Sequence, residues 1–194
     1  TVRAVTDFAA GHPEVNPKQV ALYGASFGGY FALSGALGES RLAALIVNSP
    51  LLDMEEYLFA SMGPRTVEMF LKDDLSVEDL RTIPEKDLPL KFRFALLNMC
   101  LRFGKPSVKA FLESLSSFRI PGNDLQNLAM PALGLVSSGE GSVPVSQAQR
   151  FEKTAPRAAI HIFTEESGAN AHCQLDNSPL SAAVALDWLD ELLR

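Results

Sequence analysis

Gln19-Val20-Ala21-Leu22-Tyr23 runs directly into Gly24-Ala25-Ser26-Phe27-Gly28-Gly29. The first segment has an apolar strand pattern and the second places G-x-S-x-G ahead of a helical pattern, the arrangement called a nucleophile elbow. A serine at the tip of such a tight strand-to-helix turn has a strained backbone, so we expect side chains at Gly24 and Gly28 to collide with the turn. Phe27 follows the serine, so we expect its backbone N–H to open the helix and to face a developing oxyanion.

Strand and helix patterns alternate on both sides of this junction. Ala43-Ala44-Leu45-Ile46-Val47 is a continuous apolar run, which is typical of a central parallel strand buried on both faces. Further strands are predicted at 132–136 and 158–163, and helices at 1–10, 30–37, 145–154 and 179–193. This alternation predicts an α/β fold with a mostly parallel sheet.

The middle of the chain has a different pattern. Between residues 53 and 128 no good strand is found, and segments such as 67–71 and 108–112 have helical spacing. The segment from Leu88 to Phe103 is apolar on nearly all sides, so it either packs in a core or lines an apolar pocket. We therefore predict a core formed by residues 1–52 and 129–194, interrupted by a helical lid at 53–128.

Composition excludes several classes of partner. The 194-residue chain has a net charge of -6 with 17 basic residues, which argues against nucleic acid and anionic membranes as partners. No apolar run reaches the length of about 18 residues that a membrane span needs. Cys100 and Cys173 are the two cysteines and form neither a disulfide framework nor a metal cluster. We expect a cytoplasmic protein without a cofactor or metal.

A serine nucleophile needs a base, and the chain has three histidines. His12 lies in a turn before the first strand, and His161 lies inside the last strand, where a structural role is favoured. His172 follows the last strand in a loop of small and polar residues. Ligand and catalytic groups gather at the carboxyl ends of parallel strands, so we predict His172 as the base.

The third group should orient the imidazole and follow a strand between the serine and the histidine. Glu140 meets both conditions, because it follows the strand at 132–136. Competing carboxylates follow the strand at 43–47, and any of them could be the orienting acid or a second carboxylate that serves the substrate: Asp53, Glu55 and Glu56. Asp176 is too near His172 along the chain to be preferred. Cys173 is interpreted as a small packing residue.

With Ser26, Glu140 and His172 in this order, the chain resembles the α/β-hydrolase superfamily over nearly its whole length. The segments 26–30, 41–44 and 171–173 resemble the branch that holds the fermentation-respiration switch protein, the bacterial dihydroxypseudooxynicotine hydrolase and the fungal yellowish-green pigment heptaketide hydrolases. The resemblance implies a helical cap between the sixth and seventh strands. It also implies hydrolysis of carbon–carbon or ester bonds in aromatic or polyketide-like substrates. Glu140 stands where aspartate is commoner in the superfamily.

The resemblance also implies four strands before the elbow strand, for which this chain has room only for a helix. Those strands would supply a second oxyanion-hole N–H and would cover the sheet edge next to residues 19–23. We therefore expect the chain to be the C-terminal part of a longer protein. We expect the open edge to associate with the missing portion or with a second copy in a homodimer.

Three functions are compatible with these residues. The first is a serine hydrolase that forms an acyl-enzyme on Ser26 from an apolar or aromatic small-molecule substrate. The second is an acyltransferase or cyclase with the same triad, because a dry pocket under a lid limits hydrolysis. The third is a non-catalytic binding module that keeps the elbow as a scaffold.

Overall fold

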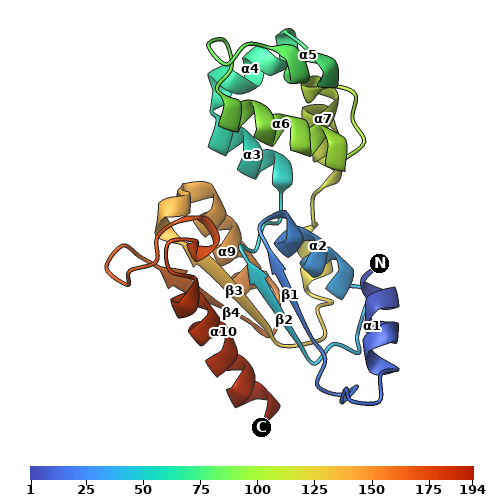
Figure 1. Cartoon of the computed structure of the whole chain (residues 1–194). Coiled ribbons are helices and arrows are strands. Elements are labelled where there is room, and N and C mark those ends of the chain that lie inside the picture. Colours follow the sequence, from blue (N-terminus) through green and yellow to red (C-terminus); the bar gives the residue numbers. More distant parts are fainter. The chain divides into compact units, whose positions relative to one another are not determined.

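A computed structural model describes all residues from 1 to 194 (Figure 1). The chain forms two compact units, a sheet unit of residues 1–53 and 120–194 and a helical unit of residues 54–119. Residues 120–128, which the sequence pattern assigned to the lid, belong to the sheet unit. The N–H of Ile120 donates to the carbonyl of Leu52 at 2.8 Å, and Leu125 and Leu128 are buried.

The sheet unit is built on a parallel sheet in the order β1-β2-β3-β4 (Figure 1). Every residue of β2 and β3 is buried, as expected for apolar runs in the centre of a parallel sheet. The first strand begins and ends two residues later than the sequence pattern predicted, and so reaches the elbow directly. The strand bounds are β1 Ala21–Ala25, β2 Ala44–Asn48, β3 Ala132–Ser137 and β4 Ala158–Phe163.

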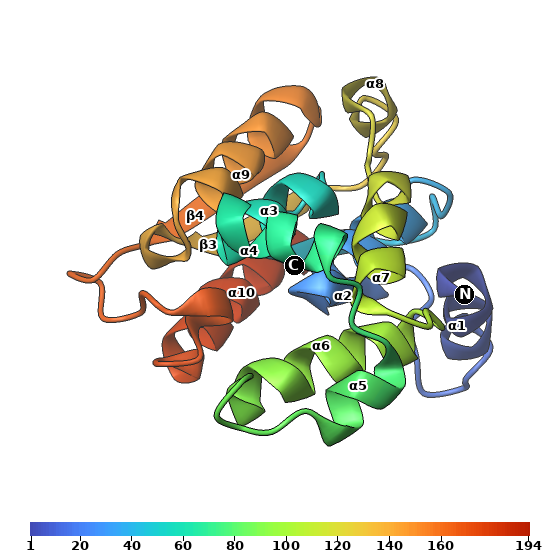
Figure 2. The same ribbon diagram turned by 90° about the horizontal axis from the view of Figure 1, so that it is seen from above.

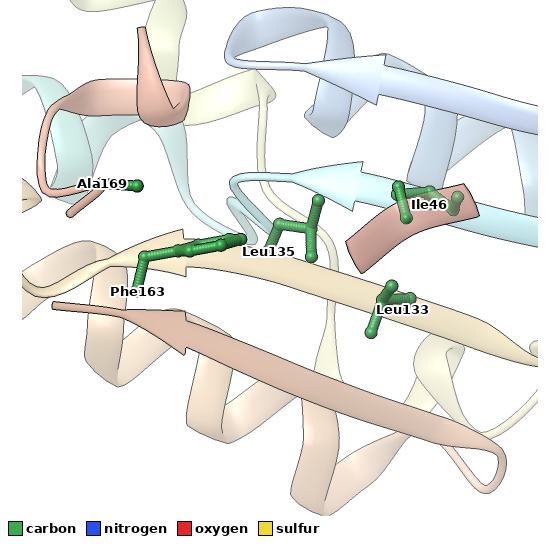
Figure 3. Close-up of a cluster of buried hydrophobic side chains, with 6 residues drawn as sticks. Ile46, Leu133, Leu135, Phe163 and Ala169 are labelled. Atoms are coloured by element: carbon green, nitrogen blue, oxygen red, sulfur yellow. The ribbon is translucent and has the colours of Figure 1, made fainter. Parts of the chain in front are cut away.

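Helices cover both faces of this sheet. Gly24 of β1 and Gly134 of β3 lie on one face, where α2 (Phe27–Ala36) and α9 (Ser142–Thr154) pack against them. The other face carries a buried cluster against which α10 (Ser178–Leu193) packs through Leu180, Val184, Trp188 and Leu189. Figure 3 shows that cluster, which consists of Ile46, Leu133, Leu135, Phe163, Ala169 and Ala185. The remaining helices of the unit are α1 (Val2–Ala10) and α8 (Gly122–Leu125), with short 3₁₀ turns at 138–140 and 172–174.

The strands β1 and β4 form the edges of the sheet. Tyr23 on β1 is 53% exposed, and Ala21 and Ala25 on the same face are also exposed. Unpaired backbone groups along an edge strand are available to another strand. The partner expected at the β1 edge therefore stays a prediction.

The helical unit contains no strand. Its helices α5 and α6 lie side by side, and so do α4 and α7 (Figure 2). Apolar side chains at helical spacing form its core, including Phe70, Leu80, Leu96 and Phe111. The segment predicted at 88–103 is the helix α6, which buries Leu96 and Cys100 and exposes other apolar side chains. The bounds are α3 Met54–Met62, α4 Pro64–Lys72, α5 Val77–Thr82, α6 Leu90–Arg102 and α7 Val108–Ser114, followed by a 3₁₀ turn at 115–117.

Candidate active site

Ser26 sits at the turn between β1 and α2, as the sequence predicted. Its backbone has φ 53° and ψ -127°, a conformation that a residue with a side chain rarely adopts. The N–H of Ser26 donates to the carbonyl of Asn48 at 2.5 Å, which fixes the turn to the end of β2. Strain of this kind persists only where the surrounding structure enforces it, and it commonly marks a functional site.

The glycines around Ser26 differ from the expectation in one respect. A Cβ atom at Gly24 would lie 2.2 Å from the carbonyl oxygen of Gly28, and one at Gly29 would lie 2.6 Å from that of Ser49. A Cβ at Gly28 would meet nothing within 4 Å. The predicted collision at Gly28 is therefore wrong, because that position faces open space. Gly29, which lets the first turn of α2 approach the end of β2, is the second position that has no room for a side chain.

The structure brings Ser26, His172 and Glu140 together from three different loops. Nε2 of His172 lies 2.9 Å from Oγ of Ser26, and Nδ1 of the same ring lies 2.5 Å from Oε2 of Glu140. The imidazole therefore bridges the hydroxyl and the carboxylate through its two nitrogens. This is the relative geometry that a nucleophile, a base and an orienting acid require.

Glu140 is almost completely enclosed, with 1% of its side chain exposed. Oε1 accepts from the N–H of Ser137 at 3.0 Å, and Oγ of Ser49 lies 2.8 Å from both carboxylate oxygens and donates to them. Burial acts to raise the pKa of Glu140, but hydrogen bonds from His172, Ser137 and Ser49 outweigh it and hold that pKa below its usual range. The residue therefore faces His172 as a fixed negative charge.

The base has an unusual neighbour. Sγ of Cys173 lies 3.5 Å from Nε2 of His172 and donates to the carbonyl of Asn48 at 3.2 Å. The contact with the Cys173 thiol and then the hydrogen bond with Glu140 raise the pKa of His172 to about 10, against the opposing effect of burial. Both contacts favour the imidazolium, which is the form that the ring takes after it removes a proton from Ser26.

Two further contacts fix the loops that carry the acid and the base. Oδ1 of Asn170 accepts from the N–H of Gly139 at 2.6 Å and from Oγ of Ser138 at 2.9 Å. Oδ2 of Asp176 accepts from the N–H groups of Asn170 at 2.7 Å and Ala171 at 3.1 Å. Hydrogen bonds from these backbone groups, that of Asn170 first, lower the pKa of Asp176. Asp176 therefore fixes the backbone of the loop that carries His172. Its hydrogen bonds go to that backbone and not to the imidazole ring.

The other residues considered from the sequence lie elsewhere. Asp53 is buried, and its backbone N–H and carbonyl are bound by the side chain of Gln147. Its negative charge contributes, after burial, to a raised pKa of Tyr30. Glu56, like its neighbour Glu55, belongs to the helical unit on α3. None of these three carboxylates takes the place of Glu140 on Nδ1 of His172.

The remaining predicted positions are also resolved. His12 lies in an exposed turn, and His161 is an exposed residue of β4 whose ring lies 4.4 Å from that of Phe163. Neither ring contacts Ser26, whose Oγ faces His172. Phe27 is the first residue of α2, so its N–H belongs to the N-terminal turn of that helix.

Sequence reasoning missed three polar residues at this edge of the sheet. Ser49 binds Glu140, while Asn48 and Gln174 form a buried amide pair with Nδ2 of Asn48 donating to Oε1 of Gln174 at 2.8 Å. A signal was present for the first two, because Asn48-Ser49-Pro50 ends an apolar strand and the carboxyl ends of parallel strands collect functional groups. Gln174 had no comparable signal, since its place depends on the path of the loop after β4.

An apolar groove of about 550 Å³ adjoins the site on the α10 face of the sheet. Ala25 and Cys173, the chain neighbours of Ser26 and His172, form part of its lining, together with Tyr23 on β1 and Leu186 on α10. No group of His, Cys, Asp or Glu side chains in the structure is arranged to hold a metal ion. No helix has both the length and the apolar character needed to cross a bilayer.

Comparison with known proteins gives a clear result for the fold alone. No protein-family model and no curated protein matches this sequence. Among solved structures, MenH from S. aureus is 17% identical with a TM-score of 0.56, over 99% of this chain and 74% of that one. The 2,6-dihydroxy-pseudo-oxynicotine hydrolase is 22% identical with a TM-score of 0.56, over 99% and 45%. The α/β-hydrolase GrgF from Penicillium sp. sh18 is 23% identical with a TM-score of 0.56, over 99% and 68%.

These similarities define the class of structure. The parallel sheet, the flanking helices and the matched structures show an α/β-hydrolase fold, of which this chain spans between about half and three quarters in those proteins. The superfamily resemblance predicted from the sequence is thus confirmed at the level of the fold. Identities below 25% carry no activity from those proteins to this one, so the function must be argued from the site itself.

Proposed function

We propose that this protein is a serine hydrolase that cleaves an ester, thioester or carbon–carbon bond through an acyl-enzyme on Ser26. The observation that carries the proposal is the position of the His172 ring. Its Nε2 lies 2.9 Å from Oγ of Ser26, while its Nδ1 lies 2.5 Å from the buried carboxylate of Glu140. A serine becomes an effective nucleophile when a base with such a partner accepts its proton.

The proposed first half-reaction transfers the acyl group of the substrate to Ser26. Nε2 of His172 takes the proton of Ser26 as Oγ attacks a substrate carbonyl, and Glu140 stabilises the imidazolium that results. The N–H of Phe27 is the candidate donor to the oxyanion, supported by its place as the first residue of α2. The imidazolium then returns the proton to the leaving group, which departs and leaves an acyl group on Ser26.

The second half-reaction regenerates the serine. A water molecule gives up a proton to Nε2 of His172 and attacks the acyl carbonyl, and Ser26 leaves as the ring protonates it. An alcohol or thiol in place of water would give acyl transfer, which is the second function considered from the sequence. Nothing in the geometry favours that acceptor over water, so hydrolysis is the proposal.

The proposed substrate carries an apolar or aromatic acyl group. The mainly apolar groove of about 550 Å³ that adjoins Ala25 and Cys173 supports this class, because binding sites for such ligands are apolar with few polar groups. The proposed cytoplasmic residence and the proposed lid role of the helical unit rest on the sequence pattern.

A chain-length series of p-nitrophenyl esters tests this function. We expect hydrolysis by the wild-type protein, with kcat/KM rising from the acetate to the octanoate ester, and loss of hydrolysis in Ser26→Ala. Glu39→Gln is a matched control, because Glu39 is a buried carboxylate paired with Arg41 and away from the triad. Equal hydrolysis by Ser26→Ala and the wild-type protein would refute the proposal.

A further inference from the structure

The base reaches Ser26 from the far side of the sheet. His172 follows β4, whereas Ser26 follows β1, and β3 and β2 lie between these two edge strands. The loop that starts after Phe163 must therefore cross the carboxyl ends of two strands before the imidazole meets the hydroxyl. His172 has 36% of its side chain exposed and lies on a one-turn 3₁₀ segment, so its own packing does not fix its position. The loop therefore needs a further contact that anchors it to the sheet.

The side chain of Gln174 makes that connection. Gln174 is fully buried, although it lies at the end of a short 3₁₀ turn, and its amide binds the last residue of each central strand. Its Oε1 accepts from Nδ2 of Asn48 at 2.8 Å, and its Nε2 donates to Oγ of Ser137 at 2.9 Å. Asn48 and Ser137 are themselves 1% and 0% exposed, so both bonds are shielded from water.

The two anchors also bind the other members of the triad. The carbonyl of Asn48 accepts from the N–H of Ser26 at 2.5 Å, and the N–H of Ser137 donates to Glu140 at 3.0 Å. One buried amide thus joins the turn of the base to the two residues that fix the nucleophile and the acid. The backbone of this turn is unusual, since Cys173 and Gln174 both have a φ of 51°. Residues with side chains take up this conformation when their surroundings enforce it.

We propose that Gln174 is a positioning residue whose buried amide holds His172 in register with both Ser26 and Glu140. The inference rests on the proposed function for its catalytic consequence, and on the hydrogen bonds alone for its structural one. The hydrogen bonds of the Gln174 side chain go to Asn48 and Ser137, and not to the imidazole or to the reacting atoms. Its effect is to keep the distances from His172 to Ser26 and Glu140 within hydrogen-bond reach.

The chain supplies a matched control for the test. Gln147 on α9 is equally buried, and its amide accepts from the N–H groups of Leu52 and Asp53 and donates to the carbonyl of Asp53. Substitution of Gln147 therefore removes the same kind of buried hydrogen bonds, and these bonds do not involve Ser26, Glu140 or His172. Gln174→Met and Gln147→Met lose similar polar contacts, so a general loss of packing affects both.

The experiment measures the second-order rate of labelling by a fluorophosphonate at a temperature where each variant is folded. We expect Gln174→Met to react on the order of 100-fold more slowly than the wild-type protein, the scale of a misplacement of about 1 Å. Gln147→Met should stay within about threefold, because an independent site does not couple to the triad. Labelling of both variants at the wild-type rate would overturn the proposal, and so would equal slowing of both.

Two additions keep the test decisive. Should Gln174→Met fail to fold, Ser137→Ala removes one of the two bonds while its backbone N–H still holds Glu140, and labelling at the wild-type rate would then overturn the proposal.

NMR titration of the His172 ring gives a readout that does not depend on activity. We expect the pKa of His172 to fall in Gln174→Met, as the ring leaves Glu140, and an unchanged titration would contradict the positioning role. A wild-type protein that no fluorophosphonate labels refutes the proposed function, while this titration still tests Gln174.

Discussion

The substitution Glu140→Gln tests how the acid controls the proton on the base. Oε1 of Glu140 accepts from the N–H of Ser137 at 3.0 Å, so the amide oxygen of a glutamine would keep that place. The amide nitrogen would then replace Oε2, which lies 2.5 Å from Nδ1 of His172. An N–H at this position makes Nδ1 an acceptor and leaves the ring proton on Nε2, facing Ser26. The ring could then no longer remove the proton from Ser26.

The expected loss is large because this change reverses the tautomer while it keeps the shape of the site. The same change in a Ser-His-Asp enzyme lowers kcat by about 10⁴-fold, which corresponds to about 5.5 kcal/mol of activation free energy. We expect a loss of that order in kcat for p-nitrophenyl acetate and in the rate of fluorophosphonate labelling. Circular dichroism and the midpoint of thermal unfolding show whether the variant is folded.

The control for this prediction is Glu39→Gln, which replaces a buried carboxylate paired with Arg41 beyond the C-terminal end of α2. We expect that variant to react at nearly the wild-type rate. A folded Glu140→Gln protein that reacts within tenfold of the wild type would refute the reasoning. It would show that the tautomer of His172 is not set by Glu140.

Further predictions concern the pH profile and the elbow. Because contacts with Cys173 and then with Glu140 raise the pKa of His172, the labelling rate should climb with pH and reach half its maximum above pH 6.5; a half-maximum at or below pH 6.5 would contradict this. Stability from the charged ring is fully present below 6.5 and should be lost as the pH rises through about 10, which unfolding midpoints between pH 6 and 11 measure. Cys173→Ala should move the climb to lower pH, since the thiol contact raises this pKa most, and an unmoved profile would sink that explanation. Gly24→Ala should destabilise the fold by about 3 kcal/mol or more in urea unfolding, because its Cβ would lie 2.6 Å from that of Ala32, whereas Gly28→Ala should be tolerated; equal midpoints would disprove the difference.

Much of the fold follows from local pattern. The continuous apolar run at 43–47, which covers all of β2 except Asn48, is typical of the centre of a parallel sheet, and the structure buries every residue of that strand. The residues of the candidate triad followed from a topological rule, since the carboxyl ends of parallel strands meet at one edge. This rule places Ser26, Glu140 and His172 near one another without any knowledge of side-chain contacts.

The parts that sequence could not supply depend on contacts between distant segments. Residues 120–128 lack a strand pattern, as the lid does, and only their burial in the sheet unit and the hydrogen bond from Ile120 to Leu52 assign them to the sheet unit. The requirement at Gly29 arises from the approach of Ser49, which is 20 positions away in the chain, and spacing around the serine does not reveal it. Gln174 lies in a left-handed turn that no residue type at that position predicts.

The central claim is that Ser26 is a nucleophile activated by His172. Labelling with a fluorophosphonate, read by intact mass and by mapping the modified peptide, tests it most directly. We predict a single adduct on Ser26 in the wild-type protein, no adduct in Ser26→Ala, and strongly slowed labelling in His172→Ala. A folded protein that takes up no label, or that is labelled at a residue other than Ser26, would contradict the account.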